Sequence, residues 1–295
     1  MLKPLYGPLF RAREFLRSDP FKGVPGDAPV RRVLQRRSLA ERRYVIFFTP
    51  RSGSSRIESI LRAEPALGLP GEYFSPYNMP RLARNVGATD FEMLVDLVQR
   101  GRRSTGHFGF KITYRQILTA FGGETAFHRH FGDAVMFWLI RRDIVAQAVS
   151  SSRMVQTALR HLKTPDPDRV EEADSLFLYR PLELKERIRR LRWMEDRTEA
   201  YFARHGIEPI RACYESLSAL SPREIAAAFS DWLGATDPPD PDPSDKHARV
   251  SGGKSVEFAA RFRADHARWL ARVENGRRPL MDALPAKGVP CPARP

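Results

Sequence analysis

A short turn rich in small and basic residues follows the first strongly apolar run of the chain. Residues 44–48, YVIFF, are typical of a strand buried on both faces of a parallel sheet, and residues 56–63 are predicted to form the next helix. A strand–turn–helix unit points backbone N–H groups and the positive end of the helix dipole at one spot. Gly53 permits a close backbone approach, Arg51 supplies a fixed cation, and the serines supply hydroxyl donors. The turn is therefore predicted to bind a tetrahedral oxyanion through Pro50, Arg51, Ser52, Gly53, Ser54 and Ser55.

This turn differs from the phosphate-binding loop of ATP- and GTP-hydrolysing proteins. That motif, G-x-x-x-x-G-K-[ST], places a lysine after its second glycine and a hydroxyl on Mg²⁺. Here the turn is shorter, and an arginine precedes its glycine. Taken alone, the segment also fits an ordinary strand-to-helix connection capped by serine.

A second basic segment follows another apolar run. Residues 134–140, AVMFWLI, predict a buried strand, and Arg141, Arg142 and Asp143 come directly after it. Open α/β sheets bind ligands at the carboxyl ends of their strands, where Arg141 is expected. Ser150 lies about two turns into the following helix and is able to face the same anion. The alternative is a pair of surface arginines beside a helix start, neutralised by Asp143.

Strands and helices alternate along the chain, as a parallel sheet requires. Strands are predicted at 44–48, 107–112, 134–140 and 208–214, and helices at 56–63, 91–103, 144–162, 182–204, from Ser221 onward and at 256–273. Residues 164–181 are predicted to be a loop and residues 237–245 a rigid acidic hinge. The alternation predicts an α/β fold, a P-loop-like three-layer sandwich with a central, mostly parallel sheet flanked by helices.

The composition fits a protein that attracts anions in a reducing compartment. The 295 residues include 49 Lys and Arg against 35 Asp and Glu, a formal net charge of +14, which draws nucleotides, nucleic acid or acidic lipid. The basic residues form no recognisable nucleic-acid-binding module, so nucleic acid is not expected as a partner.

Cys213 and Cys291 are the only cysteines, which excludes a cysteine zinc cluster or a disulfide framework. We expect a cytoplasmic protein, since neither a signal peptide nor an apolar stretch of membrane-spanning length is present.

The first 43 residues form a basic lead-in. They carry eleven Lys and Arg against four Asp and Glu, with aromatic residues scattered among them. We therefore expect an N-terminal arm at 1–43, packed or flexible, in which residues 11–17 can form a short helix. The alternative is an interfacial anchor that meets anionic lipid. One domain is expected at 44–295.

The two basic segments together resemble the PAPS-dependent sulfotransferases of the Stf0 type, a bacterial group whose members sulfate carbohydrates and glycolipids. The resemblance extends over roughly residues 44–275 and leaves out the lead-in. Its motifs are the turn PRSGSS, the helix end LRA, GEYF at 71–74, Lys111 in GFKI, Arg141, Asp143, QAVS at 147–150, Arg153 and VQT at 155–157. Several unusual motifs thus recur in the family's order.

The resemblance implies binding sites for the donor PAPS and for PAP, the product that it leaves. Residues 51–55 would bind the 5′-phosphosulfate, and Arg141 with Ser150 would hold the 3′-phosphate. Arg142 is a close rival of Arg141, because a slip of one residue in the matching exchanges them. Residues 249–255, RVSGGKS, resemble a late basic loop that closes over the nucleotide. In it Arg249 and Lys254 flank two glycines, which permits an anion nest, although a mobile loop without this role is the alternative.

The same resemblance implies a catalytic set of Glu72, Arg51 and Lys111. Glu72 occupies the position of the family's candidate general base, which would take the proton of the acceptor hydroxyl. Partial burial beside Tyr73 and Phe74 would suit that role, because burial raises the pKa of a carboxyl group. Arg51, Lys111 and backbone N–H groups would stabilise the charge on the transferred group. No metal is expected, since the seven histidines are dispersed and lack ligand spacing.

The predicted function is therefore the transfer of a sulfuryl group from PAPS to a hydroxyl of a carbohydrate or glycolipid. Leu69 stands where trehalose-sulfating members carry an acidic residue, which favours another saccharide or a glycolipid over trehalose. A P-loop phosphotransferase and a non-catalytic nucleotide-, anion- or membrane-binding protein on the same fold are the alternatives. A homodimer, and a peripheral contact of the arm with the inner face of the membrane, are compatible with the sequence.

Overall fold

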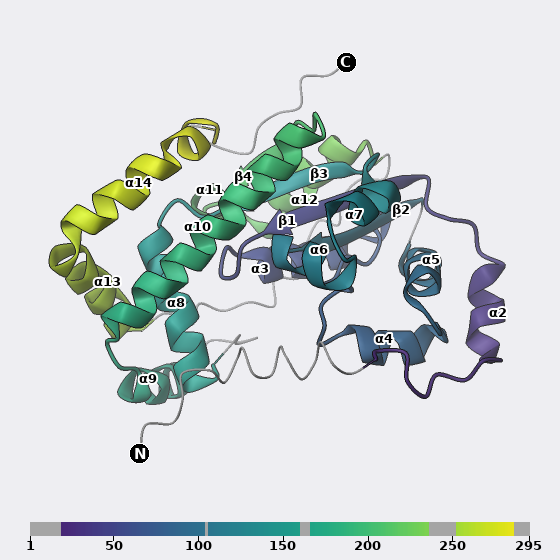
Figure 1. Ribbon diagram of the computed structural model, residues 1–295, viewed down its shortest axis with the longest axis horizontal. Coiled ribbons are helices and arrows are strands. Elements are labelled where there is room, and N and C mark those ends of the chain that lie inside the picture. Colours follow the sequence, from purple (N-terminus) through teal and green to yellow (C-terminus); the bar gives the residue numbers. More distant parts are fainter. Residues whose placement is uncertain (1–18, 104–105, 160–165, 236–251, 286–295) are drawn as a thin grey trace. The chain divides into compact units, whose positions relative to one another are not determined.

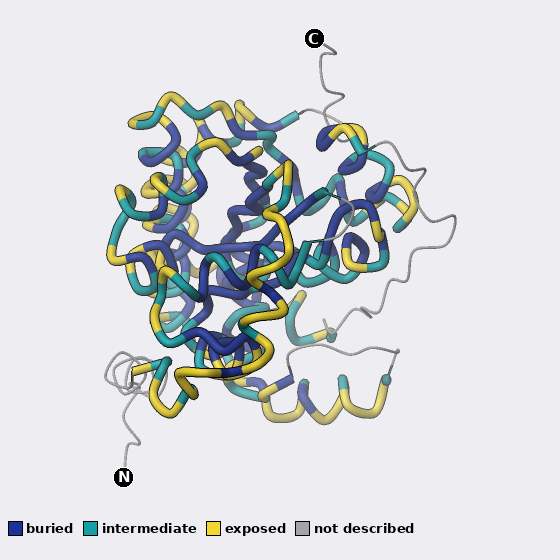
Figure 2. The backbone as a smooth tube through the Cα atoms, turned by 90° about the vertical axis from the view of Figure 1, so that its right-hand side faces the viewer, coloured by how far each residue is buried: buried dark blue, intermediate teal, exposed yellow. Residues whose placement is uncertain are grey.

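Four parallel strands form one central sheet in the order β2-β1-β3-β4. The computed structural model describes residues 19–103, 106–159, 166–235 and 252–285. Within them the strands are β1 (Arg42–Phe48), β2 (His107–Ile112), β3 (Val135–Ile140) and β4 (Ile210–Cys213) (Figure 1). β2 is buried throughout, and β1 and β3 are buried over their last five residues (Figure 2). Burial on both faces explains why these strands are continuous apolar runs. The predicted α/β class, with a parallel sheet flanked by helices, is confirmed.

The chain divides into two compact units. The first contains the described residues up to Ile46 together with Pro65–Val135, and the second contains Phe47–Glu64 together with the described residues from Met136 onward. The turn at 49–55 and the segment that begins at Arg141 both fall in the second unit. Glu72 and Lys111 both fall in the first.

Phenylalanine rings fill the core of the first unit. Its helices are α2 (Pro29–Gln35), the short 3₁₀ helix η1 (Pro65–Leu67), α4 (Met79–Val86), α5 (Phe91–Arg102), α6 (Tyr114–Ala120) and α7 (Glu124–Phe131). The ring of Phe74 is 1% exposed, and its centroid lies 5.0 Å from that of Phe110 and 5.0 Å from that of Phe121. These edge-to-face contacts hold the loop that carries Glu72 against β2 and against the residue that ends α6.

The second unit is built around α8 (Ile144–Thr157), the helix that follows Arg141. Its other helices are α3 (Ser54–Ala63), α9 (Pro167–Leu176), α10 (Pro181–Arg204), α11 (Tyr214–Ser218), α12 (Pro222–Leu233), α13 (Gly253–Asp265) and α14 (Ala267–Asp282). Helix α8 contacts α9, α10 and α13, and the buried faces of α8, α10, α13 and α14 share one apolar cluster (Figure 1). This packing fixes α8 relative to the helices on either side of it.

Most of the predicted elements are confirmed within a few residues, with two corrections. The predicted loop at 164–181 contains α9, in which Asp166 caps the first turn by accepting from the Arg169 N–H and Pro167 occupies the first helical turn. The predicted helix at 256–273 is two helices that meet at His266, where φ is −131°. Neither a glycine nor a proline marks this break, so the sequence pattern shows no boundary there.

Part of the predicted arm is a packed helix. Helix α2 contacts α4 and α5 and buries Leu34, which is 8% exposed. The short helix expected at 11–17 and the hinge expected at 237–245 lie outside the described residues. Among the helices that the structure describes, none combines the length and apolar character needed to cross a bilayer.

Candidate active site

The register of β3 and β4 brings two distant chain segments together at the carboxyl edge of the sheet. The two strands pair in parallel, with Ile140 opposite Cys213. Arg141 and Tyr214 are therefore the first residues beyond neighbouring strand ends. The centre of the Arg141 guanidinium lies 4.5 Å from the centroid of the Tyr214 ring, a cation–π contact.

The turn after β1 adopts an unusual backbone conformation. Both Arg51 (φ 68°) and Gly53 (φ 84°) occupy the left-handed region. For the arginine this costs about 1–3 kcal/mol, a strain that is typical of functional turns. At Gly53 a Cβ atom would lie 2.6 Å from Cδ2 of Tyr214, so the ring packs where only glycine leaves room. The side chain of Gln147 supports the turn by donating to Thr49 Oγ1 and to the Pro50 carbonyl, each at 2.8 Å.

These segments line one cavity of about 550 Å³, within the range of about 300–1,000 Å³ common for small-molecule sites. The amino end of α3, with Ser54 and Ser55, forms part of its wall, so the positive end of the helix dipole faces the cavity. Its charged lining consists of five arginines and two carboxylates: Arg51, Arg56, Arg141, Arg153, Arg263, Asp143 and Glu215. The excess of cations suits a ligand with several negative charges.

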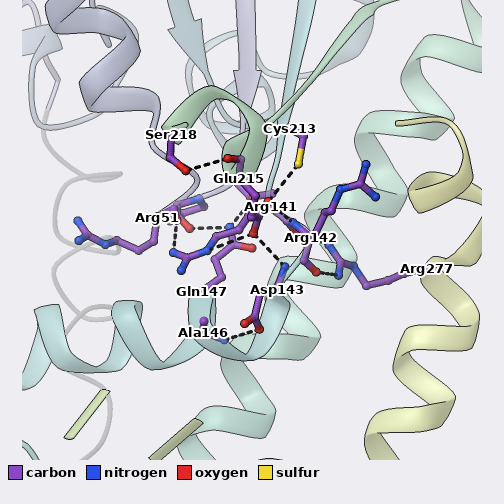
Figure 3. Close-up of polar contacts among 12 residues, drawn as sticks. Arg51, Arg141, Arg142, Asp143, Ala146, Gln147, Cys213, Glu215, Ser218 and Arg277 are labelled. Atoms are coloured by element: carbon purple, nitrogen blue, oxygen red, sulfur yellow. Dashed lines mark hydrogen bonds and ion pairs between the residues drawn. The ribbon is translucent and has the colours of Figure 1, made fainter. Parts of the chain in front are cut away.

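Arg51, Arg141 and Ser150 meet around this cavity. Arg51 Nε donates to Ser150 Oγ at 2.9 Å. Arg141 Nη1 donates to the Arg51 carbonyl at 3.1 Å (Figure 3). Burial, followed by the charge of Arg141, lowers the pKa of Arg51 below its ordinary value. An anion placed between the two guanidinium groups would relieve this repulsion. The structure thus brings together the two segments that the sequence selected independently.

The neighbouring arginine points elsewhere. Arg142 Nη2 donates to the carbonyl of Pro285 at 2.9 Å, and Arg142 is absent from the cavity lining. Of the two rivals, Arg141 is the one that faces the cavity.

The remaining predicted residues of the donor site are placed as follows. The Ser52 side chain is buried, and its Oγ has no hydrogen-bond partner among the described residues. Lys254 Nζ lies 3.4 Å from the carbonyls of Ser175 and Phe177, and Lys254 is not among the residues that line the cavity, although Ser255 is. Arg249 lies outside the described residues. The role predicted for the late loop stays a prediction.

Glu72 belongs to a polar cluster in the first unit. Its Oε1 accepts from Gln116 Nε2 at 2.5 Å, and its Oε2 lies 3.8 Å from Lys111 Nζ. Gln116 is itself fixed by the capping box of α6, in which its Oε1 accepts from the Thr113 N–H at 2.8 Å. The Glu72 side chain is 30% exposed, whereas that of Lys111 is 6% exposed. The carboxylate is therefore oriented by two partners and still open to solvent.

Sequence reasoning missed Tyr214 and Glu215, which lie against the predicted anion site. The signal was present, because Tyr214 ends the strand predicted at 208–214 and Glu215 directly follows it, which places both at the edge where ligands bind. Gln116 was missed as well. Its capping position after β2 can be recognised from T-x-x-Q at 113–116, but the contact with Glu72 cannot.

The fold and the cavity define an α/β protein with a basic pocket at the carboxyl edge of a parallel sheet. A family model of the Stf0 sulphotransferases matches residues 43–265, and the chain belongs to this family. The resemblance seen in the sequence motifs is thereby confirmed.

The chain is similar to two known proteins. The chain is 28% identical over 269 residues to trehalose 2-sulfotransferase of Mycobacterium tuberculosis (strain ATCC 35801 / TMC 107 / Erdman), a match that covers 78% of this chain and 98% of that protein. The crystal structure of a sulfotransferase from Alicyclobacillus acidocaldarius superposes with a TM-score of 0.44 at 16% identity, covering 80% of this chain and 96% of the other.

Proposed function

We propose that this protein transfers a sulfuryl group from PAPS to a hydroxyl of a carbohydrate or glycolipid acceptor. The observation that carries the proposal is the meeting of the turn at 51–55 with Arg141 and Ser150 around one basic cavity. Membership of the Stf0 family supports sulfuryl transfer as the chemistry. PAPS supplies an activated sulfuryl group on a phosphate leaving group.

The charges of the second unit support binding of such a donor. The amino end of α3 and Arg51 suit the 5′-phosphosulfate, because backbone N–H groups and a guanidinium fork match tetrahedral oxyanions. The orphaned hydroxyl of Ser52 is a further donor within this turn. Arg141 and Ser150 suit the 3′-phosphate. We keep Arg249 and Lys254, the latter on the first turn of α13, as proposed contacts of the nucleotide.

The polar cluster of the first unit supports a catalytic role for Glu72. As general base, its carboxylate would take the proton while the acceptor oxygen forms a bond to sulfur and the bond from sulfur to the phosphate oxygen breaks. The hydrogen bond from Gln116 fixes one carboxylate oxygen and leaves the group partly exposed for the acceptor. Lys111 would neutralise charge on the transferred group.

The acceptor is the least constrained part of the proposal. A relative that bears the name trehalose 2-sulfotransferase favours a saccharide, while Leu69 replaces the acidic residue expected of a trehalose-binding site. We therefore propose another saccharide or a glycolipid. We also propose a cytoplasmic site of action, with the basic arm in contact with anionic lipid at the inner face of the membrane.

The test combines binding with turnover. Purified protein is titrated with PAP and with ATP, and then incubated with labelled PAPS and a lipid or saccharide extract of its host. We expect PAP to bind more tightly than ATP and label to appear in an acceptor. Glu72→Gln should abolish transfer while PAP still binds, and the exposed Glu92→Gln, on α5 of the same unit, should retain both.

The outcomes distinguish the alternatives. Binding of PAP without transfer to any fraction would favour a non-catalytic binding protein. Preference for ATP would favour a phosphotransferase, and transfer that survives in Glu72→Gln would remove Glu72 as the base.

A further inference from the structure

Two consecutive peptide groups at the end of β3 are each held at both ends. They are the peptide that joins Arg141 to Arg142 and the peptide that joins Arg142 to Asp143. Arg277, on α14, donates through Nη2 to the Arg141 carbonyl and through Nη1 to the Arg142 carbonyl, each at 2.7 Å (Figure 3). One planar guanidinium fork thus grips both carbonyl oxygens.

A carboxylate accepts hydrogen bonds from the N–H groups of the same two peptides. Glu215 Oε2 accepts from the Arg142 N–H at 3.0 Å, and Glu215 Oε1 accepts from the Asp143 N–H at 3.2 Å. We call Arg277, Glu215 and the two peptides between them the peptide clamp. Its four hydrogen bonds fix both peptide planes, and all of them involve a charged partner, which makes them stronger than neutral ones.

The arginine of the clamp is held rigidly. Its guanidinium forms a buried ion pair with Glu195 of α10 at 2.8–3.0 Å, and the two side chains are 2% and 1% exposed. Arg192 donates to the same carboxylate at 3.0 Å. A buried ion pair contributes little net stability compared with apolar side chains, so this pair fits a role in setting the geometry of Arg277.

The clamped backbone leads directly into the proposed donor site. Arg141, at one end, projects its guanidinium into the cavity, and Asp143, at the other, caps α8 by accepting from the Ala146 N–H at 2.9 Å. Helix α8 then carries Ser150. A rotation of either peptide would therefore move the two groups proposed to hold the 3′-phosphate.

We propose that Arg277 is a positioning residue for nucleotide binding, acting through the clamped peptides rather than by touching the ligand. It lies beyond residues 43–265, the part matched by the family model, and it is not among the cavity-lining residues. The inference rests on the proposed function, because it assigns the purpose of the clamp to the PAP site.

The test uses Arg277→Lys in the full chain. Lysine keeps the positive charge for Glu195 but cannot hold two carbonyls with one planar group. The matched control is Arg278→Lys, the same change at an exposed neighbour on α14. Two quantities are measured: hydrogen–deuterium exchange of the amides of residues 141–143 without nucleotide, and the Kd for PAP by calorimetry, where a stoichiometry near one shows that the protein is folded.

We expect Arg277→Lys to speed exchange at these amides and to raise the Kd for PAP about tenfold. A tenfold rise in Kd corresponds to the loss of one charge-assisted contact. Arg278→Lys should change neither quantity. Unchanged exchange in Arg277→Lys overturns the inference, and so does faster exchange with an unchanged Kd, because the clamp would then not set the site. Failure of the wild-type protein to bind PAP refutes the proposed donor site first and the inference with it.

A second variant covers the case in which Arg277→Lys does not fold. In Glu215→Gln a half-exposed carboxylate becomes an amide with one acceptor oxygen, so only one of the two N–H groups keeps its partner. Faster exchange at residues 142–143 with a raised Kd supports the clamp. An exchange rate and a Kd equal to those of the wild-type protein overturn it.

Discussion

Replacement of Gly53 by alanine perturbs the proposed donor site through one added carbon. The residue has φ 84°, and the new Cβ would lie 2.6 Å from Cδ2 and 3.0 Å from Cε2 of Tyr214. Ordinary contact begins near 3.4 Å, so the ring must move by about 0.8 Å. Since the Arg141 guanidinium makes a cation–π contact with the Tyr214 ring, a shift of the ring would also displace that guanidinium.

The two consequences have different magnitudes. A left-handed alanine costs about 1–2 kcal/mol, which lowers Tm by roughly 2–8 °C for a domain of this size. Loss of the cation–π contact adds about 0.5–2 kcal/mol to the free energy of PAP binding, so we expect the Kd to rise about tenfold.

Gly206→Ala is the matched control. Gly206 has φ 63°, and its added Cβ would lie within 4 Å of no described residue other than its two chain neighbours, so the variant bears a similar backbone strain without the steric overlap. Thermal unfolding and calorimetric titration with PAP measure the two effects. Both variants should have a lowered Tm, Gly53→Ala at least as much as Gly206→Ala because it also bears the overlap, and only Gly53→Ala should bind PAP more weakly. Wild-type affinity in Gly53→Ala, or an equal loss in Gly206→Ala, would refute the reasoning.

Three further predictions follow from contacts described above. Arg141→Ala should weaken PAP binding by about 1.5–3 kcal/mol in calorimetry, while Arg142→Ala, whose side chain points away from the cavity, should stay within about twofold of wild type; equal losses would contradict this orientation. Phe74→Ala removes a ring that contacts four other phenylalanines and should lower the free energy of unfolding by about 3–5 kcal/mol, and a loss below about 1 kcal/mol would argue against the aromatic core. The backbone N–H of Ser221, and to a smaller extent its hydroxyl, donate to the Glu224 carboxylate and lower the pKa of Glu224. The contribution of this carboxylate to stability is therefore present above the ordinary carboxyl pKa of about 4.3 and is lost as the pH falls through the lowered pKa. Glu224→Gln should therefore lower Tm at pH 7 but not at pH 2, and an equal effect at both would contradict it.

The sequence predicted the sheet and the strand–turn–helix unit around residues 49–55 because both depend on local patterns. A strand buried on both faces must be a continuous apolar run, as residues 44–48 and 134–140 are. A turn that approaches an anion needs glycine and short polar side chains, which residues 50–55 supply.

Two features could not be predicted from local sequence patterns. Helix α9 lies in a segment rich in Asp and Pro, residues that favour turns but also cap and begin helices. The contact of Gln116 with Glu72 joins residues 44 positions apart, and no local pattern records such a pair.

The chain alone determined which residue types stand at the strand ends, and with them the positive charge at the edge of the sheet. Tertiary structure decided which of Arg141 and Arg142 faces the cavity, since two adjacent residues leave a strand in different directions and the register with β4 fixes which one enters it. Tertiary structure also decided which side chains hold the backbone of Arg141 and Arg142 in place. Arg277 reaches the Arg141 carbonyl across 136 positions of sequence, and only the packing of α14 against the rest of its unit makes them neighbours.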